Sequence, residues 1–550
     1  MKNRTKLSWE YYKKHRILYF GFILVKLLRI VVTIYLPLFF ANIITFLADK
    51  MFERVYKYIF LLALFSIISI LLKYIQKNIE NFLKISVNLI IKEKLVKKIS
   101  LLPCYLYDAY KDSKVFNILT SDSNKVAEYL LLLTDFVINI LTVIIIGIVI
   151  FNLNILLSLI IILAYPLTIL INWLYGKKIK KSSENLIIAY DSYIYAAEKV
   201  CNNFDLNIIN SHPTKLQNYF LKPYLVFKNK LLAQKKLQVN NTHLIGFISL
   251  ISYFLILIVG VRLIINGQIE LGILIAFISF SNSFTTTLNS IVFFNTNLQP
   301  TLTSIDRVIN FHSVYMKYYE ENNSKLEYKS KITNIMLENI SKHFGDKEIL
   351  RDVNINIPIN SVVGVVGENG AGKTTLFKIL SHMYLPDKGR IGVNNTWVNS
   401  INLESIYSIF SYVGINKTIY KLTVKENLLF SIRDNDFDET TLNNLLKTVN
   451  IYSDIFSLKE NINTSINNEN DLSSGQIQKI QLARMFLKNN PVLIIDEALS
   501  ELDETSRKLI LMYLKLYKKD KIIFITSHNQ KDLSTCDIVL NIKNGKIIQV

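Results

Sequence analysis

The chain has 550 residues, of which 51% are hydrophobic, 12% aromatic and only 19% charged, and its formal net charge at pH 7 is +20. A mean hydropathy of +0.29 is unusual for a soluble enzyme and favours insertion into a membrane. This apolar and aromatic content excludes a disordered, collagen-like or low-complexity chain. Cys104, Cys201 and Cys536 lie far apart in the sequence, so their spacing fits neither a disulfide framework nor a zinc site.

Six apolar segments are each about as long as is needed to cross ~30 Å of hydrocarbon. The first follows a basic stretch over residues 1–16 and continues to Ala48, which is too long for the core of a signal peptide. The other five segments are 55–75, 132–152, 154–175, 242–265 and 271–299. We therefore predict an all-α transmembrane domain of six helices over residues 17–314.

The connections between these segments predict how the chain is oriented. Two of them, 76–130 and 176–241, are long and basic, whereas the connections at 49–54, 152–154 and 266–270 are short. Because positively charged loops stay in the cytosol, we expect both long segments and both termini to be cytosolic. The basic residues then face the anionic headgroups of the lipid bilayer, which disfavours nucleic acid as a partner. Both long segments look helical, so helices should extend beyond the bilayer.

After Pro300 the composition changes to short β-branched runs that alternate with helical stretches. This pattern predicts an α/β domain over residues 331–550, joined to the membrane domain by a polar linker at 315–330. The α/β domain contains a glycine-rich loop that follows the apolar strand Val362–Val366 and precedes a helix. This is the context of a P-loop, which binds nucleotide phosphates.

The glycine-rich loop has the chemistry that ATP binding requires. Glycines let consecutive backbone N–H groups converge on phosphate oxygens, and the helix N-terminus adds positive potential. Lys373 would reach the β- and γ-phosphates, and Thr374 would offer its hydroxyl to Mg²⁺. The predicted ATP-binding residues here are Gly367, Asn369, Gly370, Gly372, Lys373, Thr374 and Thr375.

Two carboxylates follow the apolar run Pro491–Ile495. Asp496 could hold Mg²⁺ through water, and Glu497 could polarise the water that attacks the phosphate. Acidic pairs at strand ends are often only solvated termini, so the assignment depends on the glycine-rich loop in the same domain. A Ser-Ser-Gly turn at 473–475 precedes an amphipathic helix, where on its own it would be a plain N-cap.

Taken in their order along the chain, the motifs resemble those of one family. The whole chain resembles an ABC exporter half-transporter, in which six transmembrane helices are fused to one nucleotide-binding domain. In that family the glycine-rich loop is Walker A, the Asp-Glu pair is Walker B and residues 1–16 would form an elbow helix. The resemblance adds further site residues: the signature residues Ser473, Ser474, Gly475 and Gln476, the D-loop residues Ser500 and Asp503, the switch histidine His528, and Phe344. Phe344 would stack on adenine or, alternatively, only pack at a strand edge.

One position departs from the family. Ile415 stands where the glutamine of the Q-loop is expected, and a branched alkyl group can neither bind Mg²⁺ nor hydrogen-bond a water. Asn416 could take this role after a shift of one residue in the alignment. Because Glu497 and His528 are present, we still expect hydrolysis of ATP with Mg²⁺.

The resemblance also implies a dimer and a mechanism. The signature of one subunit closes over the γ-phosphate held by the Walker A loop of the other, so a second half-transporter is needed, and we favour a homodimer over a heterodimer. The cytosolic loops near 109–118 and 190–200 would couple the domains and drive alternating access. Glu198 in the second loop is either a contact residue or part of a solvated helix face.

The cargo is predicted less directly. A polar stripe on the sixth segment would face a cavity or form hydrogen bonds between helices; it contains Asn282, Thr285, Thr286, Asn289 and Thr296. Lys26 and Arg29 could bind an anionic cargo group or reach the inner headgroups. The signature helix is similar to those of bacteriocin and lantibiotic-type peptide exporters, which implies a peptide cargo and a bacterial cytoplasmic membrane. The alternatives are a lipid flippase, a multidrug exporter, or an ATP-gated channel or sensor.

Overall fold

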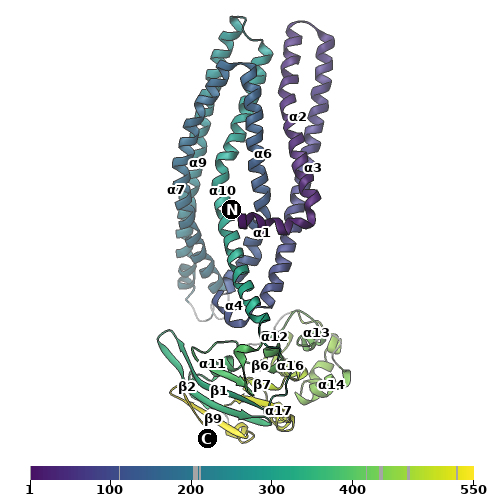
Figure 1. Ribbon diagram of the computed structural model, residues 1–550, viewed down its shortest axis with the longest axis vertical. Coiled ribbons are helices and arrows are strands. Elements are labelled where there is room, and N and C mark those ends of the chain that lie inside the picture. The colour runs from purple at the N-terminus through teal and green to yellow at the C-terminus, as the bar shows by residue number, and fades with distance from the viewer. Residues whose placement is uncertain are drawn as a thin grey trace. The chain divides into compact units, whose positions relative to one another are not determined.

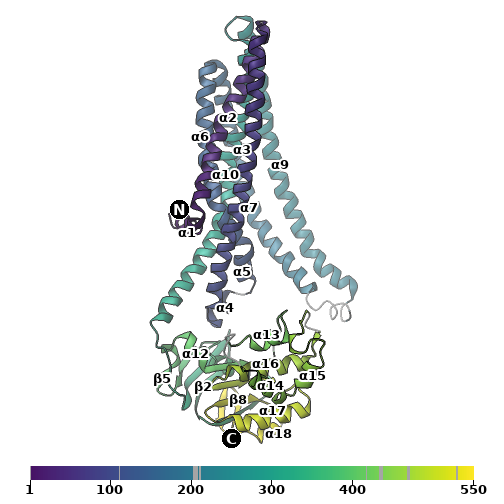
Figure 2. The same ribbon diagram turned by 90° about the vertical axis from the view of Figure 1, so that its right-hand side faces the viewer.

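The computed structural model describes residues 2–110, 112–201, 209, 212–415, 418–432, 438–467, 471–527 and 530–549. The chain divides into two compact units: the first comprises Met1–Lys97 and Val115–Phe311, and the second Lys98–Lys114 and His312–Val550. Figures 1 and 2 show that the first unit is built of long helices, while the second combines sheets with shorter helices.

The helices of the first unit include the short polar α1 and six long helices that match the apolar segments of the sequence. They are α1 (Lys2–Tyr12), α2 (Arg16–Ala48), α3 (Phe52–Ser100), α6 (Ser123–Leu153), α7 (Ile155–Cys201), α9 (Pro213–Ile265) and α10 (Leu271–Asn323). Six helices among the described residues are long and apolar enough to cross a membrane, so the predicted number of spans is confirmed. Helices α3, α7 and α9 have 49, 47 and 53 residues, far more than the ~20 that a membrane requires. Helices of this length can extend beyond the hydrocarbon, and α7 and α9 lie side by side (Figures 1 and 2).

The helices pack closely beside the short connection between α9 and α10. A Cβ atom on Gly272 would clash with the carbonyl oxygen of Ala41, so glycine lets α10 approach the backbone of α2. Close backbone approach at small residues is how helices associate where no hydrophobic effect drives them together. Phe277 and Phe280 on α10 fill the adjacent core and are fully buried.

Two adjacent residues of α10 hold other helices by bidentate ion pairs. Asp306 accepts two hydrogen bonds from Arg4 of α1, at 2.8 and 2.7 Å. Arg307 donates two to Asp122, at 2.8 and 2.5 Å, and Asp122 is fully buried at the end of a π-helical turn, Ile118–Asp122. Because a buried carboxylate is costly without a partner, the Arg307 pair holds α10 against the start of α6.

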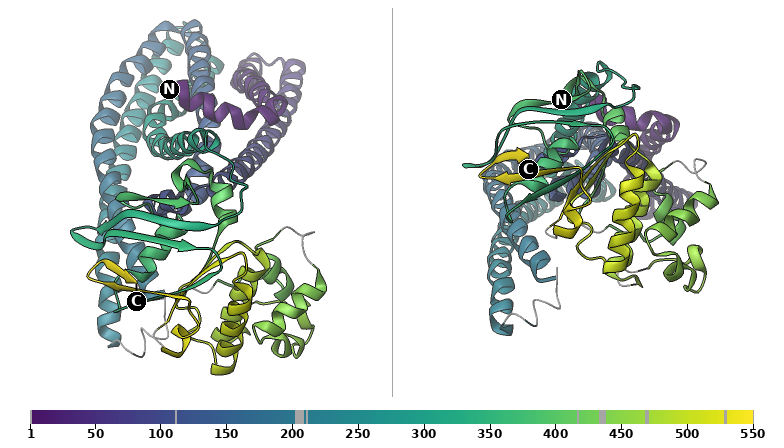
Figure 3. Two further views of the ribbon diagram at one scale, coloured as in Figure 1. Left: turned by 60° about the horizontal axis from the view of Figure 1, so that its bottom comes forward. Right: turned by 90° about the horizontal axis from the view of Figure 1, so that it is seen from below.

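The second unit contains two sheets. The antiparallel sheet has the order β2-β1-β4-β5, and the second sheet has the order β10-β9-β3-β8-β7-β6, in which only the β9–β10 pair is antiparallel. Figure 3 shows the yellow C-terminal strands beside the green strands and the helices of residues 424–517 together on one side. The strands are β1 (Asn334–Phe344), β2 (Lys347–Pro358), β3 (Ser361–Gly367), β4 (Lys388–Val393), β5 (Thr396–Trp397), β6 (Phe410–Val413), β7 (Val492–Ile495), β8 (Ile522–Thr526), β9 (Ile538–Lys543) and β10 (Lys546–Gln549).

The parallel strands explain why the site lies where it does. All residues of β7 and β8 are buried, as expected for strands that are covered on both faces. Parallel strands bring their carboxyl ends to one edge, and that is where ligands bind in such sheets. The helices of this unit are α4 (Cys104–Tyr110), α11 (Lys373–Leu380), α12 (Leu403–Ile409), α13 (Val424–Leu429), α14 (Glu439–Thr448), α15 (Tyr452–Phe456), α16 (Ser474–Lys488), α17 (Glu504–Tyr517) and α18 (Gln530–Leu533), and α5 (Asp112–Asn117) crosses the boundary between the units.

The division of the chain differs in two details from the predicted domains. Helix α10 continues to Asn323, so the predicted linker 315–330 begins as helix, with Tyr315 stacked on Tyr319 at 5.8 Å. Residues 98–114, which we placed in the membrane domain, pack with the second unit. Tyr105 of α4 lies edge-on to His382 at 5.6 Å, and burial lowers the pKa of His382 to about 4, so this contact is made by a neutral ring.

Candidate functional site

The glycine-rich loop joins β3 to α11 and is built around its own lysine. Lys373 is buried, and its Nζ donates to the carbonyl oxygens of Gly367 at 2.7 Å and Glu368 at 3.2 Å. Gly372 has φ +109°, and a Cβ atom there would lie 2.9 Å from Ile349, so both the backbone and the packing require glycine. The ammonium group therefore lies inside the loop, where it can exchange its carbonyl partners for a phosphate oxygen.

Asp496 follows β7 and is held from both sides by the neighbouring strands. The hydroxyl of Tyr412 on β6 donates to Oδ2 at 3.0 Å, and the hydroxyl of Thr526 on β8 donates to Oδ1 at 3.3 Å. Burial raises the pKa of Tyr412, and the nearby Asp496 carboxylate raises it further, so the phenol remains protonated and acts as the donor. Asp496 is only 2% exposed, and its carboxylate has a fixed orientation.

Glu497 has an unusual backbone. Its φ is +56°, in the left-handed region that residues other than glycine, asparagine and aspartate seldom adopt. Its N–H donates to Thr526 Oγ1 at 2.6 Å. Thr526 therefore contacts both members of the acidic pair. Such strained residues often occur at functional sites, where the surroundings hold them in place.

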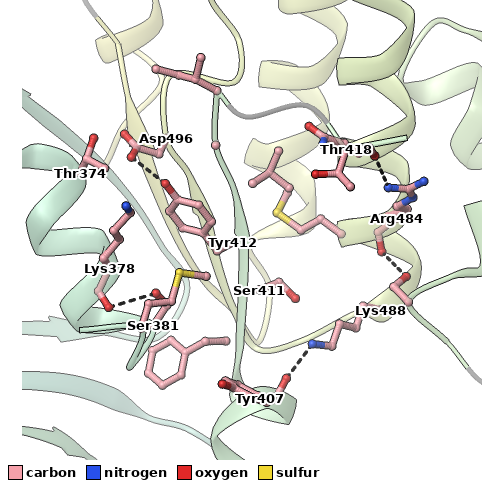
Figure 4. A pocket seen from close by; sticks show the side chains of 18 residues that line it. Thr374, Lys378, Ser381, Tyr407, Ser411, Tyr412, Thr418, Arg484, Lys488 and Asp496 are labelled. Atoms are coloured by element: carbon pink, nitrogen blue, oxygen red, sulfur yellow. Dashed lines mark hydrogen bonds between the residues drawn. The ribbon is translucent and has the colours of Figure 1, made fainter. Parts of the chain in front are cut away.

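A cavity of about 670 Å³ lies between α11, β6 and α16. Figure 4 shows Thr374 and Asp496 next to each other at one end, with Arg484 and Lys488 on the opposite wall. One hydroxyl and one carboxylate are suitable ligands for Mg²⁺, which keeps several waters and takes its remaining ligands from phosphates. In the described part of the chain, no group of three or more His, Cys, Asp or Glu side chains could hold a metal alone. The residues present thus fit a metal that is bound together with a nucleotide.

The signature turn forms the start of α16. Ser473 Oγ accepts from the N–H of Gln476 at 3.2 Å, and Gln476 Oε1 accepts from the N–H of Ser473 at 2.8 Å, which is a capping box. Ser473 and Ser474 are exposed. Of the predicted site residues, the described lining of the cavity contains Thr374 and Asp496 and none of 473–476.

The side chains of the predicted D-loop residues form hydrogen bonds within their own chain. Asp503 caps α17 by accepting from the N–H of Ser506 at 2.9 Å and from its hydroxyl at 2.6 Å. Its carboxylate also lies 3.2 Å from Lys479 Nζ on α16. The bonds from Ser506 and Thr505 hold the pKa of Asp503 well below its usual range. Ser500 donates to the carbonyl oxygen of Glu497 at 2.7 Å, so the D-loop joins the signature helix to the Walker B segment.

The other predicted residues have different environments. Phe344 is 48% exposed and touches Tyr384, which lies between α11 and β4, edge-on at 5.7 Å, so this packing covers only part of the ring. Ile415 is 53% exposed, and Asn416 and His528 lie outside the described residues. Glu198 is exposed on α7.

Sequence reasoning missed three residues of the site, namely Tyr412, Thr526 and Arg484. Arg484 of α16 donates to the carbonyl oxygens of Asn427 and Thr418, so it ties the signature helix to the segment after β6. Burial lowers its pKa. The register of the sheet could have indicated that the hydroxyls of Tyr412 and Thr526 lie near Asp496. Strands β6 and β8 both pair with β7, so their ends must flank Asp496.

Two cations of α2 are bonded to polar side chains of other helices in the membrane unit. Lys26 is buried and forms an ion pair with Asp135, and Arg29 donates to Gln76 at 2.7 Å. On α10, the hydroxyls of Thr285 and Thr286 donate to carbonyl oxygens of their own helix, whereas Asn282 is exposed. The side chain of Thr296 is not among the side chains that the structure describes. Some of the hydrogen-bonding groups of the predicted polar stripe are thus satisfied within α10.

Comparison with known proteins agrees with both units. The "ABC transporter" family model matches residues 350–500, and the "ABC transporter transmembrane region" model matches residues 19–288. The solved structure of a bacterial Atm1-family ABC exporter with ATP bound is similar, with a TM-score of 0.81 and 17% identity, covering 97% of this chain and 95% of that chain.

Two relatives are similar in sequence. A Rickettsia typhi protein, named as an export ATP-binding/permease protein, is 27% identical over 490 residues, which are 83% of this chain and 81% of that protein. An ATP-dependent lipid A-core flippase of Francisella tularensis is 32% identical over 217 residues, which are 39% of this chain and 36% of the flippase.

The fold and the site define a membrane protein in which a bundle of apolar helices is fused to a P-loop ATPase domain. The chain belongs to the ABC transporters. It is a multi-pass, ATPase-coupled exporter whose ATP-binding domain and membrane helices form one chain, and the predicted fold class and type of activity are confirmed.

Proposed function

We propose that two copies of this chain form an exporter in the bacterial cytoplasmic membrane, with both termini and the ATPase domains in the cytosol. The dimer uses ATP and Mg²⁺ to move a peptide or a similar amphiphilic compound outward by alternating access. One observation carries the dimer: Thr374 and Asp496 line the cavity, while the exposed signature serines 473 and 474 do not. A complete site therefore needs the signature of another chain.

The residues of the site have separate tasks in this proposal. Lys373 leaves its loop carbonyls to contact the β- and γ-phosphates, while Gly367, Asn369, Gly370, Gly372 and Thr375 shape the cradle. Thr374 and Asp496 would hold Mg²⁺, and the ion would supply positive charge to offset that of the phosphates. Glu497 polarises the attacking water, His528 contacts the γ-phosphate and Phe344 stacks on adenine. The partner supplies its signature and its D-loop.

Charge pairing in the membrane unit supports a cargo that is recognised without a dedicated charged site. Lys26 is neutralised by Asp135 and Arg29 is bonded to Gln76, so the two cations are engaged by the protein. The uncharged amides of Asn282 and Asn289 remain suitable donors and acceptors for the backbone of a peptide. A lipid flippase is the second candidate, and the flippase relative from Francisella tularensis favours it.

Cargo-stimulated ATPase activity tests the proposal. The purified chain in nanodiscs would be titrated with amphiphilic peptides, lipid A-like lipids and hydrophobic drugs, and uptake into inside-out vesicles would be followed for each. We expect peptides to stimulate ATP hydrolysis and to accumulate, with Glu497→Gln as the inactive control. Stimulation and uptake by lipids alone would replace the peptide with a lipid. ATPase activity of this chain in the absence of any second gene product would support the homodimer.

A further inference from the structure

We propose that Tyr412 is a positioning residue for the metal site, in that its hydroxyl holds Asp496 in the orientation that binds Mg²⁺ and compensates for the apolar Ile415. The inference rests on the proposed role of Asp496 as a metal ligand. Tyr412 touches the carboxylate through a single hydrogen bond of 3.0 Å and lines the same cavity as Thr374.

The sheet gives Tyr412 this position. Strand β7 lies between β6 and β8, and Val413 and Ile525 are both paired with Ile495. Asp496 follows Ile495, so a side chain from each neighbouring strand can reach one of its oxygens. Tyr412 reaches Oδ2 and Thr526 reaches Oδ1. With one oxygen fixed on each side, the carboxylate has no freedom to rotate away from a metal.

A second observation is independent of this bond. A Cβ atom on Gly414 would lie 2.7 Å from the hydroxyl oxygen of Tyr412 and 3.0 Å from its ring, so the phenol has this position only because residue 414 has no side chain. The carbonyl oxygen of Gly414 also accepts from Gln478 of α16 at 3.4 Å. The loop is thus shaped around the tyrosine ring and held by the signature helix.

Ile415 completes the argument. It follows Gly414 directly and is 53% exposed, and its alkyl side chain offers no atom that can bind a metal or a water. Residues 412 to 415 therefore place their one polar side chain at Tyr412. A phenol that donates to Oδ2 leaves the other lone pairs of Asp496 available for Mg²⁺ or for its waters.

Nucleotide binding without hydrolysis tests this role. In a Glu497→Gln background, the binding of a fluorescent ATP analogue would be titrated with Mg²⁺, and Mn²⁺ bound at the site would be followed by EPR. Tyr412→Phe removes one hydrogen bond to a charged group, so we expect the half-saturating Mg²⁺ concentration to rise about tenfold. Binding of the analogue in EDTA should be unchanged. Gly414→Ala, which displaces the phenol, should change the Mg²⁺ dependence in the same direction.

Controls separate this inference from the proposed function. Tyr407→Phe removes a phenol from the same cavity without touching Asp496, and its half-saturating Mg²⁺ should stay at the starting value. If Asp496→Asn does not weaken Mg²⁺ dependence, the assignment of Asp496 itself is wrong. If Asp496→Asn weakens it but neither Tyr412→Phe nor Gly414→Ala does, only the role of Tyr412 is overturned.

Discussion

The loop after β3 and the loop after β6 are built on different principles. In our proposal the first binds phosphate with backbone groups and one lysine, so its glycines are required by geometry, as the close contact at Gly372 indicates. The second acts through side chains, and there Ile415 is apolar while Tyr412 contacts Asp496. A site that depends on side chains can draw the same contact from another position, whereas a site that depends on backbone geometry cannot.

A large effect is expected at the loop after β3, where the backbone geometry leaves no alternative to the lysine. Lys373→Ala removes the cation of the Walker A loop, and loss of charge-assisted contacts of about 1.5 to 3 kcal/mol should weaken ATP binding by roughly 100-fold. Equilibrium binding of a fluorescent ATP analogue measures this. Lys388→Ala, which removes an exposed lysine of β4, is the matched control. Unchanged affinity of Lys373→Ala would contradict the assignment of the loop.

Glu497→Gln separates chemistry from binding. The amide cannot accept a proton from the attacking water, so turnover should fall by about 100-fold or more while ATP affinity is retained. Phosphate release and nucleotide binding would be measured on the same preparation. Glu504→Gln, which changes a carboxylate at the start of α17, should hydrolyse ATP normally, and equal turnover of both variants would remove Glu497 from the mechanism.

Ile415→Gln restores the family residue and sharpens the comparison. If Tyr412 serves the metal site, the new amide should leave the Mg²⁺ dependence unchanged and should instead raise the amount of cargo moved per ATP, by roughly two- to fivefold for one added hydrogen bond. Parallel assays of transport and hydrolysis in vesicles give this ratio. Ile415→Leu is the control, and a ratio equal to that of the unchanged chain would mean that the departure is tolerated.

The smallest effect is expected in the D-loop. Asp503→Ala removes an N-cap and should lower the free energy of unfolding of the ATPase unit by about 1 kcal/mol, which thermal unfolding at a series of pH values detects. Because the pKa of Asp503 is lowered by folding, its contribution is present above the ordinary value of 3.8 and is lost as the pH falls through the folded value. Asp503→Asn keeps the cap. A difference between Asp503→Ala and the unchanged chain that grows on acidification would contradict this sign.

The sequence predicted the membrane spans well because each is a local property. An apolar run of the right length must form a helix in lipid, where backbone groups can only bond within the segment, and the short connections were recognised for the same reason. The boundary between the units was less predictable. Helix α10 continues through polar residues to Asn323, and residues 98–114 join the second unit through contacts such as that of Tyr105 with His382, which are distant in sequence.

Residue order alone was enough to determine the glycine-rich loop, the acidic pair and the six apolar spans, because a loop, a strand end and a span are each encoded by neighbouring residues. Only the folded chain decided that Tyr412 and Thr526 flank Asp496, that Asp503 bonds to Ser506 beside Lys479, and that Lys26 pairs with Asp135. These contacts join residues from different strands and helices, and their partners are chosen by the register of the sheet and the packing of the helices.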